Sequence, residues 1–325
     1  MLELAADNLT SPMILCFVLG VAAALARSDL SFPEAVAKGM SIYLLFAIGF
    51  KGGVSLNEAG IDARLVGAIL AGVALSAVFP LVGFRLLALL TSLGPTDRAA
   101  IAAHYGSISI VTFVTAVSVL DAGGIAHEGY MVAVAAAMEA PAILTALWLV
   151  ARGGGTTQTG GSSGHHLREI LLNGSIVLLL GAFAIGWITG PDGQREIDAM
   201  ITAPFKGVLC LFLLDMGLVA GRGLRNARGI IGPGLLAFGV LMPLLGAAIG
   251  IAAGAMLGLS PGGVALFAVL SASASYIAVP AAMRVALPEA NPSLYLTLSL
   301  GITFPFNLVV GIPLYLWAAT ALTGG

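Results

Sequence analysis

Charged residues are scarce in this 325-residue chain: Asp, Glu, Lys and Arg make up 9% of it, against 59% hydrophobic residues. A soluble domain carries about 25% charged residues, so this scarcity, with a mean hydropathy of +1.04, predicts a protein that lies in lipid. The net charge is −2, and Lys and Arg do not cluster. Proteins that bind nucleic acid need grouped basic residues to neutralise phosphates, so that class is excluded.

Cysteine is also scarce. Cys16 and Cys210 both fall in apolar runs and are far apart in the sequence, so we expect small buried side chains and neither a disulfide nor a metal site. Glu3 and Asp7 stand where a signal peptide would carry basic residues, so no signal peptide is expected.

Long apolar runs dominate what is present. A helix that crosses a bilayer needs about 20 mainly apolar residues, and this measure predicts ten membrane-spanning segments. They lie near residues 12–27, 36–55, 65–92, 98–120, 129–151, 170–190, 203–221, 230–257, 261–286 and 293–321. We therefore predict an all-α polytopic membrane protein.

A polar stretch at 152–168 divides these segments into two sets of five. Its sequence, RGGGTTQTGGSSGHHLR, is rich in Gly, Ser and Thr and cannot bury apolar surface, which is typical of a flexible linker. His165 and His166 lie in it and are expected to be solvated loop residues, because other metal ligands are lacking. The predicted organisation is a first repeat at 1–151, a linker at 152–168 and a second repeat at 169–325.

The two halves resemble each other in sequence. Lys38-Gly39 matches Lys206-Gly207 at an offset of 168, and Ser107 matches Ser273 at an offset of 166. Since each half holds five spans, an odd number, the second copy must enter the membrane from the opposite side. This 5+5 inverted repeat is a recurrent plan of secondary transporters.

The distribution of basic residues predicts the orientation. Ten of the 14 Lys and Arg residues lie nearer to one membrane face and four nearer to the other. Basic residues are enriched in cytoplasmic loops. The linker is therefore predicted to be cytoplasmic and both termini to be periplasmic.

The fourth and ninth spans contain the least lipid-like core sequences, AHYGSISIVTFVTAVS (103–118) and SASASYIAVPAAM (271–283), at equivalent places in the two halves. Paired hydrophobic segments interrupted by Gly, Pro or Ser indicate a transporter's binding site. A helix broken at membrane depth leaves backbone N–H groups that suit an anion, and its carbonyl and hydroxyl oxygens suit a hard cation such as Na⁺.

Small serines also let membrane helices pack closely, so a single Ser carries little weight. The two clusters together, Ser107, Ser109 and Thr112 in one repeat facing Ser271, Ser273 and Ser275 in the other, favour a binding site instead.

Ionisable side chains inside spans are costly and are often functional. Glu139, two residues before Pro141, and Asp215, in the middle of the seventh span, are the best candidates. Each could bind a cation or carry a proton, or could be paired for packing alone. His104 is more typical of a satisfied or interfacial residue, and Asp121 of a solvated turn.

Four segments carry a resemblance to a known family. They are LLFAIGFKGG (44–53), YGSISIVTF (105–113), MEAPAILTAL (138–147) and RVALPEANPSLYLTLSLGITFPFNLVVGIPLY (284–315). With these segments the chain resembles, over nearly its whole length, the sodium-dependent bicarbonate permeases of the SbtA type. The resemblance implies a ten-helix 5+5 fold with gate and core regions, Na⁺-coupled bicarbonate uptake, a homotrimer and, in cyanobacteria, a PII-like regulator at the cytoplasmic face.

The same resemblance maps the substrate region onto Ser107 to Phe113 and Ser273 to Val279. Two positions depart from the family pattern: Tyr276 stands where cyanobacterial members carry Asp, and Asp215 where they are apolar. The linker is also shorter than theirs.

Together these observations predict a Na⁺-coupled bicarbonate symporter of a bacterial inner membrane, with no cofactor beyond Na⁺ and no transition-metal site. We expect the anion to be bound by Ser107, Ser109, Thr112, Phe113, Ser273, Ser275 and Tyr276. We expect the coupling ion to be bound by Ser109, Thr112, Glu139, Asp215 and Ser271.

Three alternatives remain open at this stage. The cargo could be another small carboxylate, or the coupling ion a proton carried by Glu139 or Asp215. An intramembrane enzyme would have only His104, Glu139 and Asp215 as acid and base, and the sequence contains no H-E-x-x-H run. A sensor that binds without transport is disfavoured by the inverted repeat, which supplies two access states.

Overall fold

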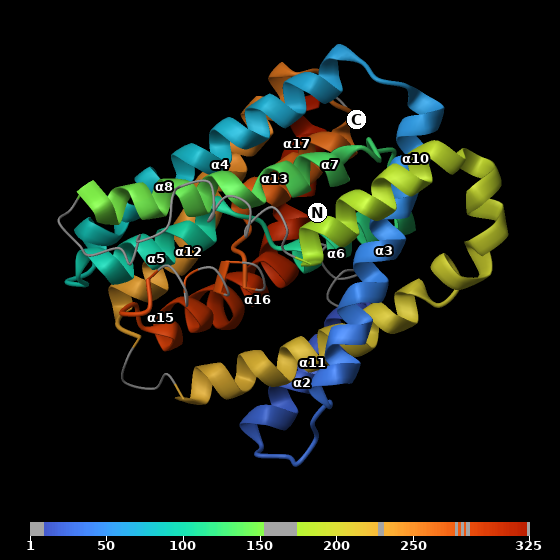
Figure 1. Cartoon of the computed structure of the whole chain (residues 1–325). Helices are drawn as coiled ribbons and strands as arrows, with labels where there is room; N and C mark the ends of the chain where they lie inside the picture. Colours follow the sequence, from blue (N-terminus) through green and yellow to red (C-terminus); the bar gives the residue numbers. More distant parts are fainter. Residues whose placement is uncertain are drawn as a thin grey trace.

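The computed structural model describes residues 10–152, 174–226, 231–276, 279–280, 283 and 287–323. These residues form helices and connecting turns, with no strand among them (Figure 1). Seven stretches of this part are long and apolar enough to cross a membrane, and two shorter apolar helices accompany them. The chain is therefore an all-helical, multi-pass membrane protein; the count of ten spans and the inverted repeat stay predictions.

The helices follow the predicted apolar runs closely. In chain order they are α2 (Pro12–Leu25), α3 (Glu34–Ala59), α4 (Ala63–Leu90), α5 (Pro95–Gly106), α6 (Ile110–Ala122), α7 (Met131–Ala137), α8 (Glu139–Arg152), α10 (Gly174–Ile201), α11 (Phe205–Asn226), α12 (Pro233–Met256), α13 (Pro261–Ala272), α15 (Pro292–Leu296), the π-helix η1 (Thr297–Thr303), α16 (Phe304–Phe306), the π-helix η2 (Asn307–Gly311) and α17 (Ile312–Thr323). Several begin with a capped first turn: the Asp62 carboxylate accepts from the Leu65 N–H at 2.8 Å, and Ser260 caps α13.

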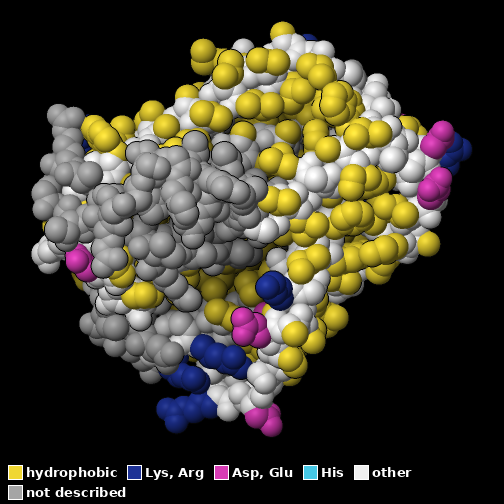
Figure 2. Space-filling view, in the orientation of Figure 1, with side chains coloured by type: hydrophobic (Ala, Val, Ile, Leu, Met, Phe, Trp, Pro, Cys, Tyr) yellow, Lys and Arg dark blue, Asp and Glu magenta, His cyan; other side chains and the backbone are white. Residues whose placement is uncertain are grey.

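Two groups of helices lie side by side in Figure 1. One contains the pairs α2–α11 and α3–α10, and the other contains α4, α5, α8, α12, α13 and the C-terminal helices. Hydrophobic side chains cover much of the face seen in Figure 2, with few charged side chains among them, as a lipid-facing surface requires.

Glycines bring the paired helices of the first group into backbone contact. A Cβ atom at Gly217 of α11 would collide with the Phe17 carbonyl of α2, and one at Gly53 of α3 would collide with the Phe183 carbonyl of α10. Small residues allow this close approach between membrane helices. Cys16 and Cys210 are free thiols whose side chains meet across the α2–α11 contact, a contact that their separation in sequence did not predict.

Prolines explain the irregular helical segments. A proline inside a helix removes an N–H and its ring clashes with the carbonyl four residues earlier. Accordingly α7 ends at Ala137, four residues before Pro141, and η1 and η2 contain the positions four residues before Pro305 and Pro313. The predicted span at 170–190 differs in one respect: α10 kinks at Gly190 (φ 59°) and continues to Ile201, because Pro191 can open a new helical turn.

The predicted linker lies almost wholly outside the described residues. Positions 153–168, with His165 and His166, belong to that undescribed part. The division into 1–151, 152–168 and 169–325 stays a prediction.

Candidate anion and cation site

The first interruption separates α5 from α6. α5 ends at Gly106, and Ser107 (φ −92°, ψ 169°) and Ser109 (φ −101°, ψ 107°) are extended before α6 begins at Ile110. The predicted break in the fourth span is therefore present, at the predicted serines. All three residues of the break are buried.

The second interruption follows α13. The helix ends at Ala272, Ser273 is extended (φ −84°, ψ 164°), and residues 273–275 are not helical. Ser273, Ser275 and Tyr276 are buried. The predicted ninth span is thus interrupted at Ser273, the residue that matches Ser107 of the first interruption in the sequence.

The two interruptions meet directly. The Ser109 N–H donates to the Ser273 hydroxyl at 2.9 Å, across 164 residues of sequence. The Ser275 N–H donates to the carbonyl oxygen of His104, in the last turn of α5, at 2.8 Å. We call the residues around these two hydrogen bonds (Ser107, Ser109, Thr112, Ser273, Ser275 and Tyr276) the serine crossing.

Hydroxyl groups gather within the serine crossing. The Ser109 hydroxyl accepts from the Thr112 N–H at 3.2 Å and from the Thr112 O–H at 2.9 Å, which caps α6. Because both of these bonds are accepted, the Ser109 O–H is free to donate, either toward the nearby Tyr276 or toward a ligand. The Ser273 hydroxyl donates to the Leu270 carbonyl at 3.0 Å.

Some buried hydroxyls of the predicted site have no hydrogen-bond partner in the described part of the chain. They include Ser107 Oγ and Tyr276 Oη at the crossing, and Ser271 Oγ one turn earlier. A buried polar group without a partner is destabilising by about 1–3 kcal/mol, so such groups indicate a binding role when they cluster. Ser271 differs from the other two because its hydroxyl faces Gly250 of α12, where an added Cβ would lie 2.8 Å away.

Backbone N–H groups add to the donors of the crossing. The first four N–H groups of a helix have no partner within the helix. In α6 the Thr112 and Phe113 N–H groups bond to Ser109, which leaves those of Ile110 and Val111. These two residues border a small cavity of about 10 Å³ shared with Phe212 of α11. The N–H groups of Ile110 and Val111, together with the positive end of the α6 dipole, suit an anion.

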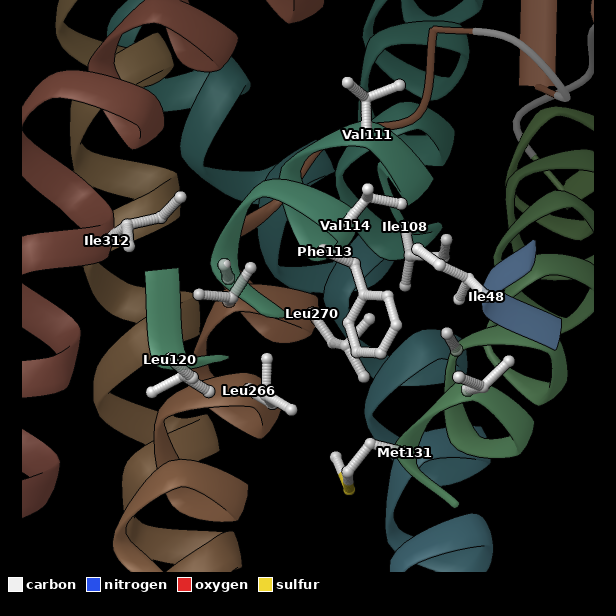
Figure 3. Close-up of a cluster of buried hydrophobic side chains, with 14 of the residues drawn as sticks. Ile48, Ile108, Val111, Phe113, Val114, Leu120, Met131, Leu266, Leu270 and Ile312 are labelled. Carbon is white, nitrogen blue, oxygen red and sulfur yellow. The ribbon is translucent and has the colours of Figure 1, made fainter. Parts of the chain in front are cut away.

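Phe113 lies beside the serine crossing and lines a larger cavity. Figure 3 shows its ring among Ile108, Ile48 and Leu270, which come from the first interruption, α3 and α13. The ring is 1% exposed and, with Leu266, lines one wall of a cavity of about 400 Å³. Phe113 thus connects the two places, since its backbone N–H bonds to the Ser109 carbonyl at 3.1 Å and the residue borders the cavity.

Charged groups line the other walls of this cavity. Lys51 of α3 and Lys206 of α11 both border it, and the Lys51 ammonium lies 5.4 Å from the centre of the Phe205 ring. Asp121 also lines it, and the His127 Nε2 atom lies 3.9 Å from the Asp121 carboxylate.

Glu128 lines the cavity and also holds the start of α13 in place. Its carboxylate accepts from the Ser260 N–H at 2.7 Å and from the Ser260 O–H at 2.9 Å, at the start of α13. A matching bond occurs at the start of α5, where the Asp97 carboxylate accepts from the Asn291 N–H at 2.8 Å. In each case a residue from one half of the chain ties down the broken helix of the other half.

Glu139 and Asp215 are both buried, each with 7% of its surface exposed. Glu139 opens α8 and its Oε2 atom has no partner among the described residues. Asp215 lies one turn along α11 from Phe212, which borders the start of α6. In the part of the chain that is described, no hydrogen bond or ion pair joins either carboxylate to the serines, so their assignment to the coupling ion stays a prediction.

His104 is held in one tautomer. Its Nδ1 atom lies 2.6 Å from the Ala100 carbonyl, which can only accept, so Nδ1 carries the proton. The ring stacks on Tyr295 at 4.5 Å between centroids, and Nε2 has no hydrogen-bond partner among the described residues. The bond between His104 and the serine crossing is the one that its backbone carbonyl oxygen accepts from the Ser275 N–H.

Asn307, which holds the end of α13 beside the serine crossing, was not identified from the sequence. Asn307, 1% exposed, donates from Nδ2 to the Ala272 carbonyl at 2.9 Å, at the end of α13, and its Oδ1 accepts from the Tyr315 hydroxyl at 2.9 Å. The sequence feature that could have identified it is an asparagine inside an apolar run, because polar side chains in membrane spans need hydrogen-bond partners.

A second set of hydrogen bonds beside the serine crossing depends on Pro243 of α12. Pro243 has no N–H for the Gly239 carbonyl in α12, and the Thr303 hydroxyl donates to that carbonyl instead, at 2.7 Å. Since the Thr303 proton is committed there, the Tyr105 hydroxyl donates to Thr303 at 2.6 Å. This chain of bonds holds α5, η1 and α12 together beside the first interruption.

Comparison with known proteins agrees with this architecture. No curated protein sequence matches the chain. A family model described as the Na⁺-dependent bicarbonate transporter superfamily matches residues 12–320, nearly the entire chain. The chain belongs to the Na⁺-dependent bicarbonate transporter superfamily.

Proposed function

We propose that the protein is a Na⁺-coupled symporter that carries bicarbonate and binds it at the serine crossing. The observation that carries this proposal is the direct hydrogen bonding of the two interruptions through Ser109, Ser273, Ser275 and His104. Paired broken helices that meet within the membrane are the binding elements of inverted-repeat transporters. Membership of the superfamily supports both Na⁺ dependence and an anionic cargo.

The proposed anion site uses donors only. The N–H groups of Ile110 and Val111 and the hydroxyls of Ser107 and Tyr276 can donate to the three oxygens of bicarbonate, and none of these groups is committed to another partner in the described residues. Because these donors are neutral, they attract a monovalent anion without a buried cation, which would be expensive in the membrane. Ser273 and Ser275 hold the geometry of the crossing.

The proposed cation site uses oxygens of the same crossing. Ser109 and Thr112 place two hydroxyl oxygens 2.9 Å apart. The Thr112 oxygen, which donates in that bond, keeps its lone pairs for a hard cation, and the Ser109 oxygen joins it when the cation displaces a bond that Ser109 accepts. Glu139, Asp215 and Ser271 are further proposed ligands or charge-compensating groups. Na⁺ beside the anion raises its affinity by charge compensation, and the anion must raise the Na⁺ affinity by the same factor. Na⁺ is the coupling ion, and no cofactor is proposed.

Transport would occur by movement of one helix group against the other. The α2–α11 and α3–α10 pairs form a group distinct from the one that carries the crossing. The 400 Å³ cavity is the proposed approach to the site, with Lys51 and Lys206 attracting the anion and Phe113 and Leu266 closing its inner wall.

Reciprocal contacts support the proposed inverted repeat. α2 pairs with α11 and α3 with α10, which are exchanged partners if α2 corresponds to α10 and α3 to α11. The Glu128–Ser260 and Asp97–Asn291 bonds are exchanged in the same way. From the basic-residue distribution and the family resemblance we further propose a bacterial inner-membrane location with periplasmic termini, a homotrimer and a PII-like cytoplasmic regulator.

A second candidate function is transport of a different small anion, or transport coupled to a different ion. Tyr276 replaces an acidic residue of the cyanobacterial permeases, and Glu139 has a buried carboxylate oxygen without a partner. These two features favour a transporter of another small carboxylate, or one coupled to protons through Glu139. Counterflow with a panel of anions, with and without Na⁺, distinguishes the two candidates.

Ser107→Ala tests the proposed site in proteoliposomes. Because the Ser107 hydroxyl has no hydrogen-bond partner among the described residues, its removal should not lower stability, whereas a binding role predicts a several-fold rise in the KM for bicarbonate. Thr115→Val is the matched control: the Thr115 hydroxyl, on the neighbouring helix α6, is already bonded to the Val111 carbonyl at 2.8 Å. An unchanged KM in Ser107→Ala, in protein of normal stability, would show that the serine only packs.

A further inference from the structure

Three arginines form a basic pocket where α2 and α11 end. The pocket has a volume of about 380 Å³ and is lined by Ala24, Arg27, Ser28, Arg222 and Arg225. In Figure 2 Lys and Arg side chains gather at this end of the molecule, next to the position of α2 and α11 in Figure 1. The positive-inside bias predicts that this end faces the cytoplasm.

Two of the arginines bond to backbone carbonyls. Arg222 donates from Nη2 to the Leu30 carbonyl at 2.7 Å, and Arg225 donates from Nη1 to the Ala24 carbonyl at 2.9 Å. The Ala24 carbonyl belongs to the negative end of the α2 dipole, which explains part of this arrangement. Each guanidinium has five N–H donors, however, so one carbonyl bond leaves most of them uncommitted.

The Arg27 guanidinium makes no such bond to a backbone carbonyl of the described residues. It forms neither a hydrogen bond nor an ion pair with any described residue, whereas the backbone N–H of Arg27 donates to the Ala24 carbonyl at 3.2 Å. The left-handed backbone of Arg27 (φ 61°) belongs to the Schellman motif that ends α2, in which the Ser28 N–H also bonds to the Ala23 carbonyl at 2.9 Å. The guanidinium is therefore the part of Arg27 that is available to a ligand.

The pocket also lacks counter-ions. Within the described ranges, no carboxylate lies within 4 Å of Arg27, Arg222 or Arg225, since the ion pairs found there are His127–Asp121 and Arg195–Asp192. Asp215 acts on Arg222 only from beyond that distance. Three positive charges thus face one concave space without neutralisation, which suits a ligand with more than one anionic oxygen.

An apolar stripe leads away from the pocket along α2. Leu15, Val18, Leu19 and Leu25 are 48–57% exposed and recur at helical spacing on one face, with Leu25 adjacent to the pocket residue Ala24. A ligand with an anionic head and an apolar tail would use both features, whereas a soluble anion would leave the stripe unused.

We propose that this pocket binds the phosphate of an anionic phospholipid, with the acyl chain along the exposed face of α2. Basic pockets between membrane helices bind lipid headgroups on the cytoplasmic side. This site is separate from the serine crossing, and its test does not depend on transport.

Native mass spectrometry of the full-length protein in detergent tests the proposal. The protein is offered phosphatidylglycerol and phosphatidylcholine with identical acyl chains, and the ratio of the two bound lipids is measured. Arg27→Asn removes the charge while keeping a residue that tolerates the left-handed conformation, and it breaks no side-chain hydrogen bond or ion pair with a described residue. Arg85→Gln, an exposed arginine on α4, is the matched control.

The wild type should retain phosphatidylglycerol in preference to phosphatidylcholine. One basic residue near an anionic headgroup contributes about fivefold in affinity, so Arg27→Asn should lower the lipid ratio about fivefold and Arg85→Gln should not change it. Equal ratios in Arg27→Asn and Arg85→Gln would overturn the proposal. A preference abolished by millimolar inorganic phosphate would also overturn it, because the ligand would then be a soluble phosphate.

Discussion

Asn307 offers a quantitative test of how the second interruption is held. Asn307→Leu keeps the volume but removes the bond to the Ala272 carbonyl and the bond from the Tyr315 hydroxyl, both 2.9 Å long, and leaves two buried groups unpaired. Side-chain hydrogen bonds within membranes contribute about 0.6 kcal/mol on average and up to about 1.7, and orphaned buried groups add to the loss. We expect a loss of about 1–4 kcal/mol in the free energy of unfolding.

The assay is unfolding in mixed detergent micelles, with Tyr315→Phe and the double variant measured alongside. Tyr315→Phe removes one bond and should destabilise by about 0.5–1.5 kcal/mol. Because the double variant no longer orphans the tyrosine hydroxyl, its loss should be smaller than the sum of the two single losses. Thr320→Val, whose hydroxyl bonds only within its own helix, is the control. Wild-type stability in Asn307→Leu, or strictly additive losses, would refute this reasoning.

Other contacts give sharp outcomes as well. Gly217→Leu should abolish stable expression, because any side chain there collides with α2 backbone, whereas Gly207→Leu on the same helix should be tolerated, since nothing lies within 4 Å; equal yields would contradict the helix pairing. A short thiol-specific cross-linker should join Cys16 to Cys210, and proteolysis within 153–173 should then leave the halves linked; separate halves would show that the thiols do not meet. Glu128→Ala should lower stability by about 1–3 kcal/mol, because it removes the carboxylate that accepts from the Ser260 N–H and O–H, and unchanged thermal unfolding would argue that this contact is dispensable.

Hydropathy predicted most of the helices. The predicted spans at 65–92 and 230–257 differ by at most three residues from α4 and α12, because a continuous apolar run at membrane depth has no alternative to a helix. The interruptions at Ser107 and Ser273 were also predictable, since their sequences were the least lipid-like of the core.

Details that depend on tertiary contacts were not predictable. Asn307 and Thr303 support the crossing through carbonyls of Ala272 and Gly239, which are distant in sequence. Pro243 showed that a carbonyl in α12 would lose its partner, but not which hydroxyl would replace it. Hydropathy does not record such pairings, because it averages over side chains that lie on different faces of a helix.

The sequence predicted which serines lie close together but not how each is oriented, and their role in binding stays a prediction. Ser107, Ser109, Thr112, Ser273 and Ser275 do come together. Periodicity alone could not show that the Ser271 hydroxyl faces Gly250 of α12, because that depends on how α13 is rotated against its neighbour.

Uptake of labelled bicarbonate into proteoliposomes, with and without an inward Na⁺ gradient, tests the central claim most directly. Protein-free vesicles and vesicles with an inward K⁺ gradient of the same size are the controls. We predict that the Na⁺ gradient drives accumulation of bicarbonate above equilibrium and that the K⁺ gradient does not. Bicarbonate uptake that is absent, or equal under both gradients, would contradict Na⁺-coupled bicarbonate symport.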